Sequence, residues 1–179
     1  MSALERPSPH VRTSYLVAMA EFADEGRGLE SDRTSLGEEI RRFGPEWSSL
    51  DGFTRYVVWL NGLAREDTPR REGFVPATTF WWVDGDTYLG RLAIRHRLTP
   101  DLLEAGGHIG YDIRPSARRQ GHATAMLRAA LPAAHALGIN PALITCDTDN
   151  IASRRVIEQN AGTFDDQRGD TLRFWVPTT

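Results

Sequence analysis

Lysine is absent from this sequence, and cysteine occurs only once, as Cys146. A single cysteine cannot form an intrachain disulfide, so nothing in the chain requires an oxidising compartment. Without lysine, all 21 cationic residues are arginine, which we attribute to a composition bias rather than to a phosphate-binding device. No apolar run is long enough to cross a bilayer, and the N-terminus has no apolar signal core. We therefore expect a soluble, cytoplasmic protein that does not associate with a membrane.

The sequence also has little net charge. A formal net charge of −3 leaves no general basic surface, which argues against a nucleic-acid-binding protein. The 179 residues are enough for one domain with a sizeable core and too few for two. There is no internal repeat, low-complexity tract or linker, so residues 1–179 are expected to form a single domain.

The first part of the chain is predicted to be helical. After a polar start that holds at most one short edge strand, apolar residues recur at helical spacing from Ser14, the expected N-cap, to the glycines at 26 and 28. A short polar helix is predicted over Leu36 to Arg42. A third helix is predicted from about Leu50 to Arg65.

From Val75 onward the pattern is typical of strands. Strand formers on both sides of Asp84-Gly85 predict a hairpin of residues 79–83 and 87–95. One helical turn is predicted around residues 101–104. The remaining chain predicts a strand (107–114), a helix (121–137), a strand (142–147), a helix (151–159) and a final hairpin (163–167 with 171–176). Pro132 predicts a kink or an early break near Arg128 in the first of these helices.

This order predicts an α/β domain with a mixed central β-sheet flanked by helices. The strands 107–114 and 142–147 are joined by a crossover helix, so we expect them to be parallel neighbours.

The loop from Arg118 to Ala123 is the first candidate for function. It places Gly121 and a small residue where a strand-following loop becomes a helix. Such a helix start offers free backbone N–H groups and the positive end of the helix dipole to an anion. Gly121 allows close approach of the backbone, and arginine side chains suit phosphate. We interpret the loop as a pyrophosphate site; the alternative is a glycine-started helix with solvated arginines.

Two segments resemble the Gcn5-related N-acetyltransferase (GNAT) superfamily. Residues 113–123, IRPSARRQGHA, match the family's acetyl-CoA loop (Q/R)-x-x-G-x-(G/A), with Arg118, Gly121 and Ala123 at the defining places. Residues 150–153, NIAS, and 160–164, NAGTF, resemble the family's N-x-x-(S/A) helix start and its closing G-x-F. The amino-acid sequence of both segments is similar to that of a bacterial branch of predicted acetyltransferases.

The resemblance implies a single-domain GNAT fold with a splayed parallel strand pair that binds acyl-CoA. The backbone of the strand ending at Ile113 would pair with the pantetheine arm, and an N–H near residues 111–113 would polarise the thioester carbonyl. Asn150 is also a good helix N-cap, and the two roles can coexist. The residues implied for acetyl-CoA binding are Ile113, Arg114, Arg118, Arg119, Gln120, Gly121, His122, Ala123, Thr124, Asn150 and Ser153.

The catalytic residues are less clearly marked. Many family members carry a tyrosine seven residues after the asparagine, and this sequence has Ile157 there. On the strand before the loop, Tyr111 is better placed as the base and His108 is chemically better suited. The alternative for Tyr111 is a buried aromatic side chain of the core. The alternative for His108 is a histidine whose hydrogen bonds are satisfied within the sheet. No cluster of cysteine and histidine suggests a metal.

The function implied is N-acetylation of a primary amine by acetyl-CoA, through direct attack in a ternary complex. We expect the N-terminal helices, about 14–66, to form the acceptor side and residues 107–164 to form the acetyl-CoA-binding core. The acceptor would be a small molecule or a peptide, and a homodimer is left open. The alternatives are a non-catalytic acyl-CoA-binding module, or an acyltransferase with another acyl donor or a hydroxyl acceptor.

Overall fold

The computed structural model describes all of residues 1–179. Three helices dominate the first part of the chain: α1 (Arg12–Asp24), α2 (Ser35–Phe43) and α3 (Leu50–Gly62). Before them lies the short edge strand β1 (Ala3–Glu5), which pairs antiparallel with β2 (Ala77–Asp84). Short 3-10 turns cover Pro9–Val11, Gly44–Glu46 and Pro115–Ala117. No helix is both long and apolar enough to cross a membrane.

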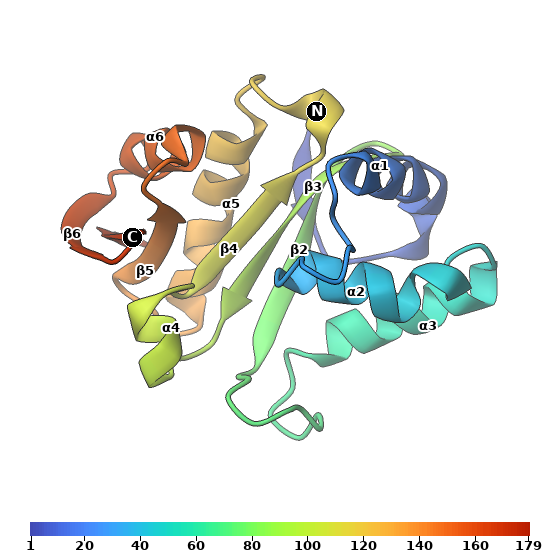
Figure 1. Cartoon of the computed structure of the whole chain (residues 1–179), viewed down its shortest axis with the longest axis horizontal. Helices are drawn as coiled ribbons and strands as arrows, with labels where there is room; N and C mark the ends of the chain where they lie inside the picture. Colours follow the sequence, from blue (N-terminus) through green and yellow to red (C-terminus); the bar gives the residue numbers. More distant parts are fainter.

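Strand β2 continues through a tight hairpin into β3 (Thr87–Arg95), and β3 pairs antiparallel with β4 (Ile109–Ile113). The strand order β1-β2-β3-β4 makes a four-stranded antiparallel sheet. The small helix α4 (Pro100–Glu104) connects β3 to β4. In Figure 1 the helices α1, α2 and α3 cover one side of this sheet, and α5 covers the other.

The second half of the chain alternates helix and strand. Helix α5 (His122–Ala136) leads to β5 (Ala142–Asp147), and α6 (Ile151–Gln159) leads to the hairpin of β6 (Thr163–Arg168) and β7 (Thr171–Val176). These strands form a second antiparallel sheet in the order β5-β7-β6.

The two sheets meet at β4 and β5, which run parallel only where they begin. There the His108 N–H donates to the Leu143 carbonyl at 2.7 Å, and no ladder joins the two strands beyond it. The mixed central sheet is therefore realised as two antiparallel sheets that meet at one splayed parallel pair. The full neighbour pairing expected from the crossover helix does not form, because β4 and β5 diverge after this contact.

Two buried apolar clusters flank the four-stranded sheet. One lies under α1 to α3, and the other lies between β3, β4, α5 and the second sheet. Alternation along β2 sends neighbouring side chains to opposite faces, so Trp81 belongs to the first cluster and Trp82 to the second. The sheet is thus the wall shared by both cores.

The predicted N-cap of α1 and the predicted early break of α5 are wrong. Helix α1 begins at Arg12 after a 3-10 turn, and Ser14 lies inside it, where its Oγ accepts the Tyr88 N–H at 3.0 Å instead of capping the helix. Helix α5 continues through Pro132 to Ala136 without a break. Both Pro132 and Arg128, whose carbonyl loses its helical donor, are exposed, so water can satisfy that carbonyl.

Candidate functional site

The loop between β4 and α5 presents a row of unused backbone donors. The first helical bond at this end is from the Ala125 N–H to the Gly121 carbonyl. None of the N–H groups from Arg119 to Thr124 donates to any acceptor in the protein. Gly121 has φ +82°, and nothing lies within 4 Å of the place where a Cβ would stand. The result is an open, electropositive helix start that can hold an anion.

The arginine side chains of this loop mostly face the protein. Arg118 donates to both oxygens of Glu25 at 2.7 and 2.8 Å, and its Nε donates to the Ile113 carbonyl at 3.1 Å. Arg114 is buried and pairs with Glu21. Of the three arginines, only Arg119 is exposed without an ion-pair partner. An anion at this loop would therefore be bound mainly by backbone N–H groups and less by arginine side chains.

Glu21 of α1 and Glu25, which directly follows the helix, lie one turn apart and hold the loop to this end of α1. Glu21 accepts from the Ser116 N–H at 3.0 Å and from the Ser116 hydroxyl at 2.9 Å, besides its contact with Arg114. The hydrogen bonds from Arg114 and Ser116 lower the pKa of Glu21 to about 2. Helix α1 thus fixes the loop by two acidic side chains.

The first turn of α5 is anchored to the rest of the fold. The Trp82 indole N–H donates to His122 Nδ1 at 3.2 Å, and the Thr124 hydroxyl donates to Gln159 of α6 at 2.8 Å. The exposed Gln120 side chain folds back onto the Ser116 carbonyl. Ala123 packs against the second core.

A cleft of about 440 Å³ opens where β4 and β5 diverge. Its lining includes Tyr111, Cys146, Asn150 and Ser153, so the structure brings the predicted strand and helix-start residues together. The Arg95 N–H bonds the His108 carbonyl, and the Arg114 N–H bonds the Leu89 carbonyl. Because bonding alternates along an antiparallel pair, the backbone groups of Tyr111 and Ile113 turn away from β3 and toward the cleft.

Tyr111 reaches across the cleft to α6. Its hydroxyl lies 2.7 Å from the Ser153 hydroxyl, and burial raises the pKa of Tyr111 to about 12. Ile157, at the position of the family's usual tyrosine, is fully buried in the core. The phenol that faces the cleft therefore comes from β4 rather than from α6.

Asn150 caps α6, as its sequence position predicts. Its side-chain oxygen accepts the Ser153 N–H at 3.0 Å, which leaves the amide nitrogen free at the cleft. The cap fixes the side chain at the helix start.

His108 lies where β4 and β5 first meet, before they separate. The Leu143 N–H donates to His108 Nδ1 at 2.9 Å, so the neutral ring carries its proton on Nε2 and has no free lone pair. Burial and the neighbouring Arg95 charge lower the pKa of His108. The geometry favours a role for this histidine in joining the two sheets over a role as a base.

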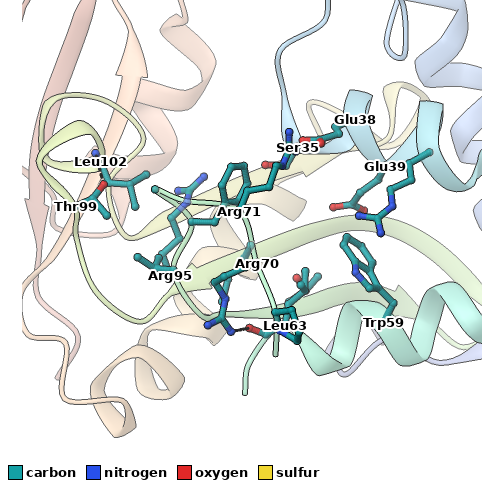
Figure 2. Close-up of a pocket in the computed structure, with 18 of the residues that line it drawn as sticks. Ser35, Glu38, Glu39, Trp59, Leu63, Arg70, Arg71, Arg95, Thr99 and Leu102 are labelled. Atoms are coloured by element: carbon teal, nitrogen blue, oxygen red, sulfur yellow. Dashed lines mark hydrogen bonds and ion pairs between the residues drawn. The ribbon is translucent and has the colours of Figure 1, made fainter. Parts of the chain in front are cut away.

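A second cavity, here called the side pocket, encloses about 600 Å³ between α2, α3, the 63–76 loop and the sheet. In Figure 2, Glu39 and Trp59 stand on one side of it, and Arg95, Thr99 and Leu102 stand on the other. The side pocket and the cleft share Ser35, Arg91, Ala93 and Arg95 in their linings. The two cavities are therefore contiguous.

A buried ion pair forms the wall between the cavities. Arg91 donates to both oxygens of Glu39 at 2.6 and 2.9 Å, and both side chains are 7 % exposed. The Tyr56 hydroxyl donates to Glu39 at 2.6 Å and lies 2.9 Å from the Tyr15 hydroxyl. Sequence reasoning did not single out these residues. The available signal was the alternation of Arg91 and Arg95 with Leu92 and Ile94, which places charges on one face of a strand.

Comparison with known proteins identifies the fold. Residues 32–162 match the family model described as an acetyltransferase (GNAT) domain. No curated protein matches the sequence significantly. The ribosomal-protein-S5-alanine acetyltransferase from Vibrio fischeri is similar in structure, with a TM-score of 0.67, 10% identity and coverage of 99% of this chain and 93% of that chain.

Two other solved structures share the fold. RimJ from Mycobacterium smegmatis, in complex with CoA-disulfide, has a TM-score of 0.64 at 16% identity and covers 98% of this chain and 81% of that chain. The microcin C7 self-immunity acetyltransferase MccE, in complex with acetyl-CoA and AMP, has a TM-score of 0.63 at 9% identity, covering 98% of this chain and 92% of that chain. The family match spans well over half of the chain, and the splayed strands and the open helix start agree with it. This chain therefore belongs to the GNAT family of acetyltransferases.

Proposed function

We propose that this acetyltransferase moves an acetyl group from acetyl-CoA to a primary amine by direct attack in a ternary complex. The observation that carries the proposal is the row of unused N–H groups from Arg119 to Thr124, directly after the strand that diverges from β5. Such a row fits a pyrophosphate and needs no further side chain. RimJ and MccE, which share the fold, are described in complexes with CoA-disulfide and acetyl-CoA.

Different residues bind different parts of acetyl-CoA. The loop from Arg118 to Thr124 holds the pyrophosphate by its backbone, with Arg119 adding side-chain charge. The backbone of Tyr111 and the N–H of Ile113, which turn away from β3, pair with the pantetheine arm, as another strand would. The free amide nitrogen of Asn150 donates to the same arm, and Ser153 lies beside it.

Tyr111 acts as the hydrogen-bond donor to the leaving sulfur. With a pKa of about 12 the phenol keeps its proton at neutral pH, so it donates rather than accepts. Its hydroxyl faces the cleft beside Ser153 of α6, on the face of β4 that packs against α5. This role replaces the base role that the sequence offered for Tyr111.

The acceptor amine enters from the side of the N-terminal helices. The side pocket lies between α2, α3 and the sheet and adjoins the cleft at Arg91 and Arg95, whose side chains line both cavities. The carboxylates that line the cleft, Asp112 and Asp147, can relay the proton of the amine to water. The protein contributes mainly by positioning donor and acceptor against each other.

Acetyl-CoA binding is tested by thermal unfolding. At a thousand times its dissociation constant a ligand stabilises the fold by about 4 kcal/mol, so acetyl-CoA should raise the melting temperature clearly. Gly121→Val should remove this shift, because the new side chain occupies the space that phosphate oxygens need. Gly138→Val is the matched control: it lies at the other end of α5, with φ +79° and nothing within 4 Å.

The control should lower the starting melting temperature, as Gly121→Val does, yet keep the acetyl-CoA shift. No shift for the wild-type protein at millimolar acetyl-CoA would contradict the proposal. Release of free CoA thiol, measured across amines, peptides and hydroxyl compounds, then identifies the acceptor class.

A further inference from the structure

Arg95 is an arginine without an acidic partner at the junction of the two cavities. Its Nη1 donates to the Gly106 carbonyl at 2.9 Å and to the Gly107 carbonyl at 3.1 Å. No hydrogen bond or ion pair uses its Nε or Nη2. These two donors form one edge of the guanidinium, and the same edge of Arg65 binds both oxygens of Asp67 at 2.9 and 2.7 Å. Arg95 therefore presents a carboxylate-binding edge with no carboxylate on it.

The neighbouring arginines of the cavities are neutralised or solvated. Arg91 pairs with Glu39, Arg71 with Glu38 and Arg27 with Asp112, while Arg33 and Arg42 are exposed. Arg70 has no acidic partner either, but both of its terminal nitrogens donate to carbonyls of its own loop. Arg95 is half-buried, and burial together with the charge of Arg91 lowers its pKa. A positive charge in such a place is stabilised by an anion that the protein itself does not supply.

The free edge lies close to the reacting centre. A Cβ at Gly110 would stand 3.8 Å from both Nη1 and Nη2 of Arg95, and Gly110 directly precedes Tyr111. An anion bound to Arg95 is thus one strand residue from the backbone N–H of Tyr111, which faces the thioester side of the cleft, while the phenol points to the opposite face of β4, toward α6. The amine that attacks there and the anion bound here must be separated by only a few bonds.

The side pocket indicates what the rest of the acceptor looks like. Its lining contains Phe43, Trp59, Leu63 and Phe74, which offer an apolar and aromatic surface. We propose that the acceptor is an α-amino acid with an apolar side chain, whose carboxylate binds the free edge of Arg95 and whose side chain occupies the side pocket. This inference rests on the proposed acetyl transfer to an amine, because it describes the other substrate of that reaction.

The test compares amino acids with their amides. L-Phenylalanine, L-tryptophan and L-methionine are each paired with the corresponding amide, and kcat/KM is measured by thiol release with saturating acetyl-CoA. Binding of the same compounds to the CoA-loaded protein is measured by calorimetry. Loss of the carboxylate lowers the pKa of the α-amine, so intrinsic reactivity favours the amides. Recognition by Arg95 should reverse this, and each acid should be preferred about tenfold to a hundredfold.

Three variants locate the preference. Arg95→Gln removes the charge but can still donate to the Gly106 carbonyl, and it should abolish the preference for acids while leaving the acetyl-CoA melting shift unchanged. Gly110→Asp places a carboxylate beside the free edge and should also abolish it, with Arg95 still present. Gly110→Asn is the control of equal size without charge, and it should keep the acid-to-amide ratio even if turnover falls.

Two results would overturn the proposal. One is a wild-type protein without the preference for acids, either because it acetylates or binds the amides equally well or because it neither binds nor acetylates any of the acids. The other is an Arg95→Gln protein that keeps the wild-type ratio. In either case an intact acetyl-CoA melting shift leaves the donor site standing, whereas loss of that shift in the wild-type protein contradicts the proposed function itself.

Discussion

At the scale of single residues, the ion pair of Glu39 and Arg91 is buried on both sides and bidentate. It lies between α2 and β3, with Tyr56 as a third partner, and it forms the wall between the cleft and the side pocket. A buried pair of this kind adds little net stability over an apolar pair of the same volume. Its effect is to fix one position of α2 against the sheet, and with it the shape of both cavities.

Removing one partner of this pair should lower the free energy of unfolding by far more than the intact pair adds to it. Glu39→Gln leaves the Arg91 charge buried without a counter-ion, so we expect a loss of about 3–5 kcal/mol in the free energy of unfolding. The measurement is urea-induced unfolding. Glu38→Gln, which removes the exposed pair with Arg71 on the same helix, should cost at most about 1 kcal/mol.

Should Glu39→Gln fail to fold, the double variant Glu39→Leu with Arg91→Met removes both charges and should fold with nearly wild-type stability. Equal effects of Glu39→Gln and Glu38→Gln would contradict this account of the pair.

Tyr111 belongs to the same scale. Tyr111→Phe removes the donor that we assign to the leaving sulfur, and one hydrogen bond to a charged group contributes about 1.5–3 kcal/mol. We expect kcat to fall about tenfold to a hundredfold, with the KM for acetyl-CoA little changed. Because the pKa of Tyr111 is raised to about 12, the phenol stays protonated at neutral pH, and its removal should not move the pH–rate profile there.

Steady-state kinetics of Tyr111→Phe over a pH series checks both statements. His108→Gln is a useful companion, because the geometry assigns this histidine to the contact between the sheets. It should lower the melting temperature more than it alters the pH dependence of the rate. An unchanged kcat in Tyr111→Phe would remove the tyrosine from the mechanism.

At the scale of elements, the sequence predicts most of the helices and strands because local signals are strong. Helix α6 has the predicted bounds, since Asn150 caps it and Gly162 follows it. The hairpin at Asp84-Gly85 and the strand β5 also agree with their patterns. The start of α1 was misplaced because a 3-10 turn at Pro9–Val11 runs into it, and the tolerance of α5 for Pro132 depends on exposure, which periodicity alone does not give.

Only part of the candidate site is predictable, because sequence patterns report local structure and not the contacts between distant segments. Its donor half is carried by a local motif, so Gly121, Asn150 and their neighbours can be named from the sequence. The side pocket arises from α2, α3, β3 and a loop that are distant in the chain. The importance of Arg95 comes from what lies around its guanidinium, which no spacing along the sequence records.

The contact between α1 and the pyrophosphate loop gives a prediction about pH. Folding lowers the pKa of Glu21 from its usual 4.5 to about 2, so the carboxylate stabilises the native state above pH 4.5. This stabilisation is lost as the pH falls from 4.5 to about 2, where Glu21 becomes protonated in both states. Glu21→Gln should therefore lower the melting temperature at neutral pH and by progressively less below pH 4.5.

The comparison is made by calorimetry of wild type and variant across this range. Glu30→Gln is the control, because Glu30 is exposed and forms no ion pair; it should leave the melting temperature unchanged at every pH. A deficit for Glu21→Gln that does not shrink on acidification would contradict the assigned pKa.

At the scale of the whole molecule, the proposed function divides the fold into a donor side and an acceptor side that share one sheet. The proposed donor side is one continuous stretch of chain from β4 to α6, in which the N–H groups from Arg119 to Thr124 are unused. The acceptor side draws on helices and loops that can change without disturbing that stretch. This division explains why the donor is readily recognised from sequence, while the acceptor must be inferred from the side pocket.

The alternation of side chains along β2 has a consequence for spectroscopy. Trp81 and Trp82 are adjacent in the chain but buried in different cores, one beneath the N-terminal helices and one beside the pyrophosphate loop, where its indole contacts His122. In a background with Trp47, Trp59 and Trp175 replaced by phenylalanine, variants that keep only one of Trp81 and Trp82 would each emit fluorescence from a single core. The chain thus carries two optical reporters, one residue apart, that can show whether its two halves lose their structure together or in succession.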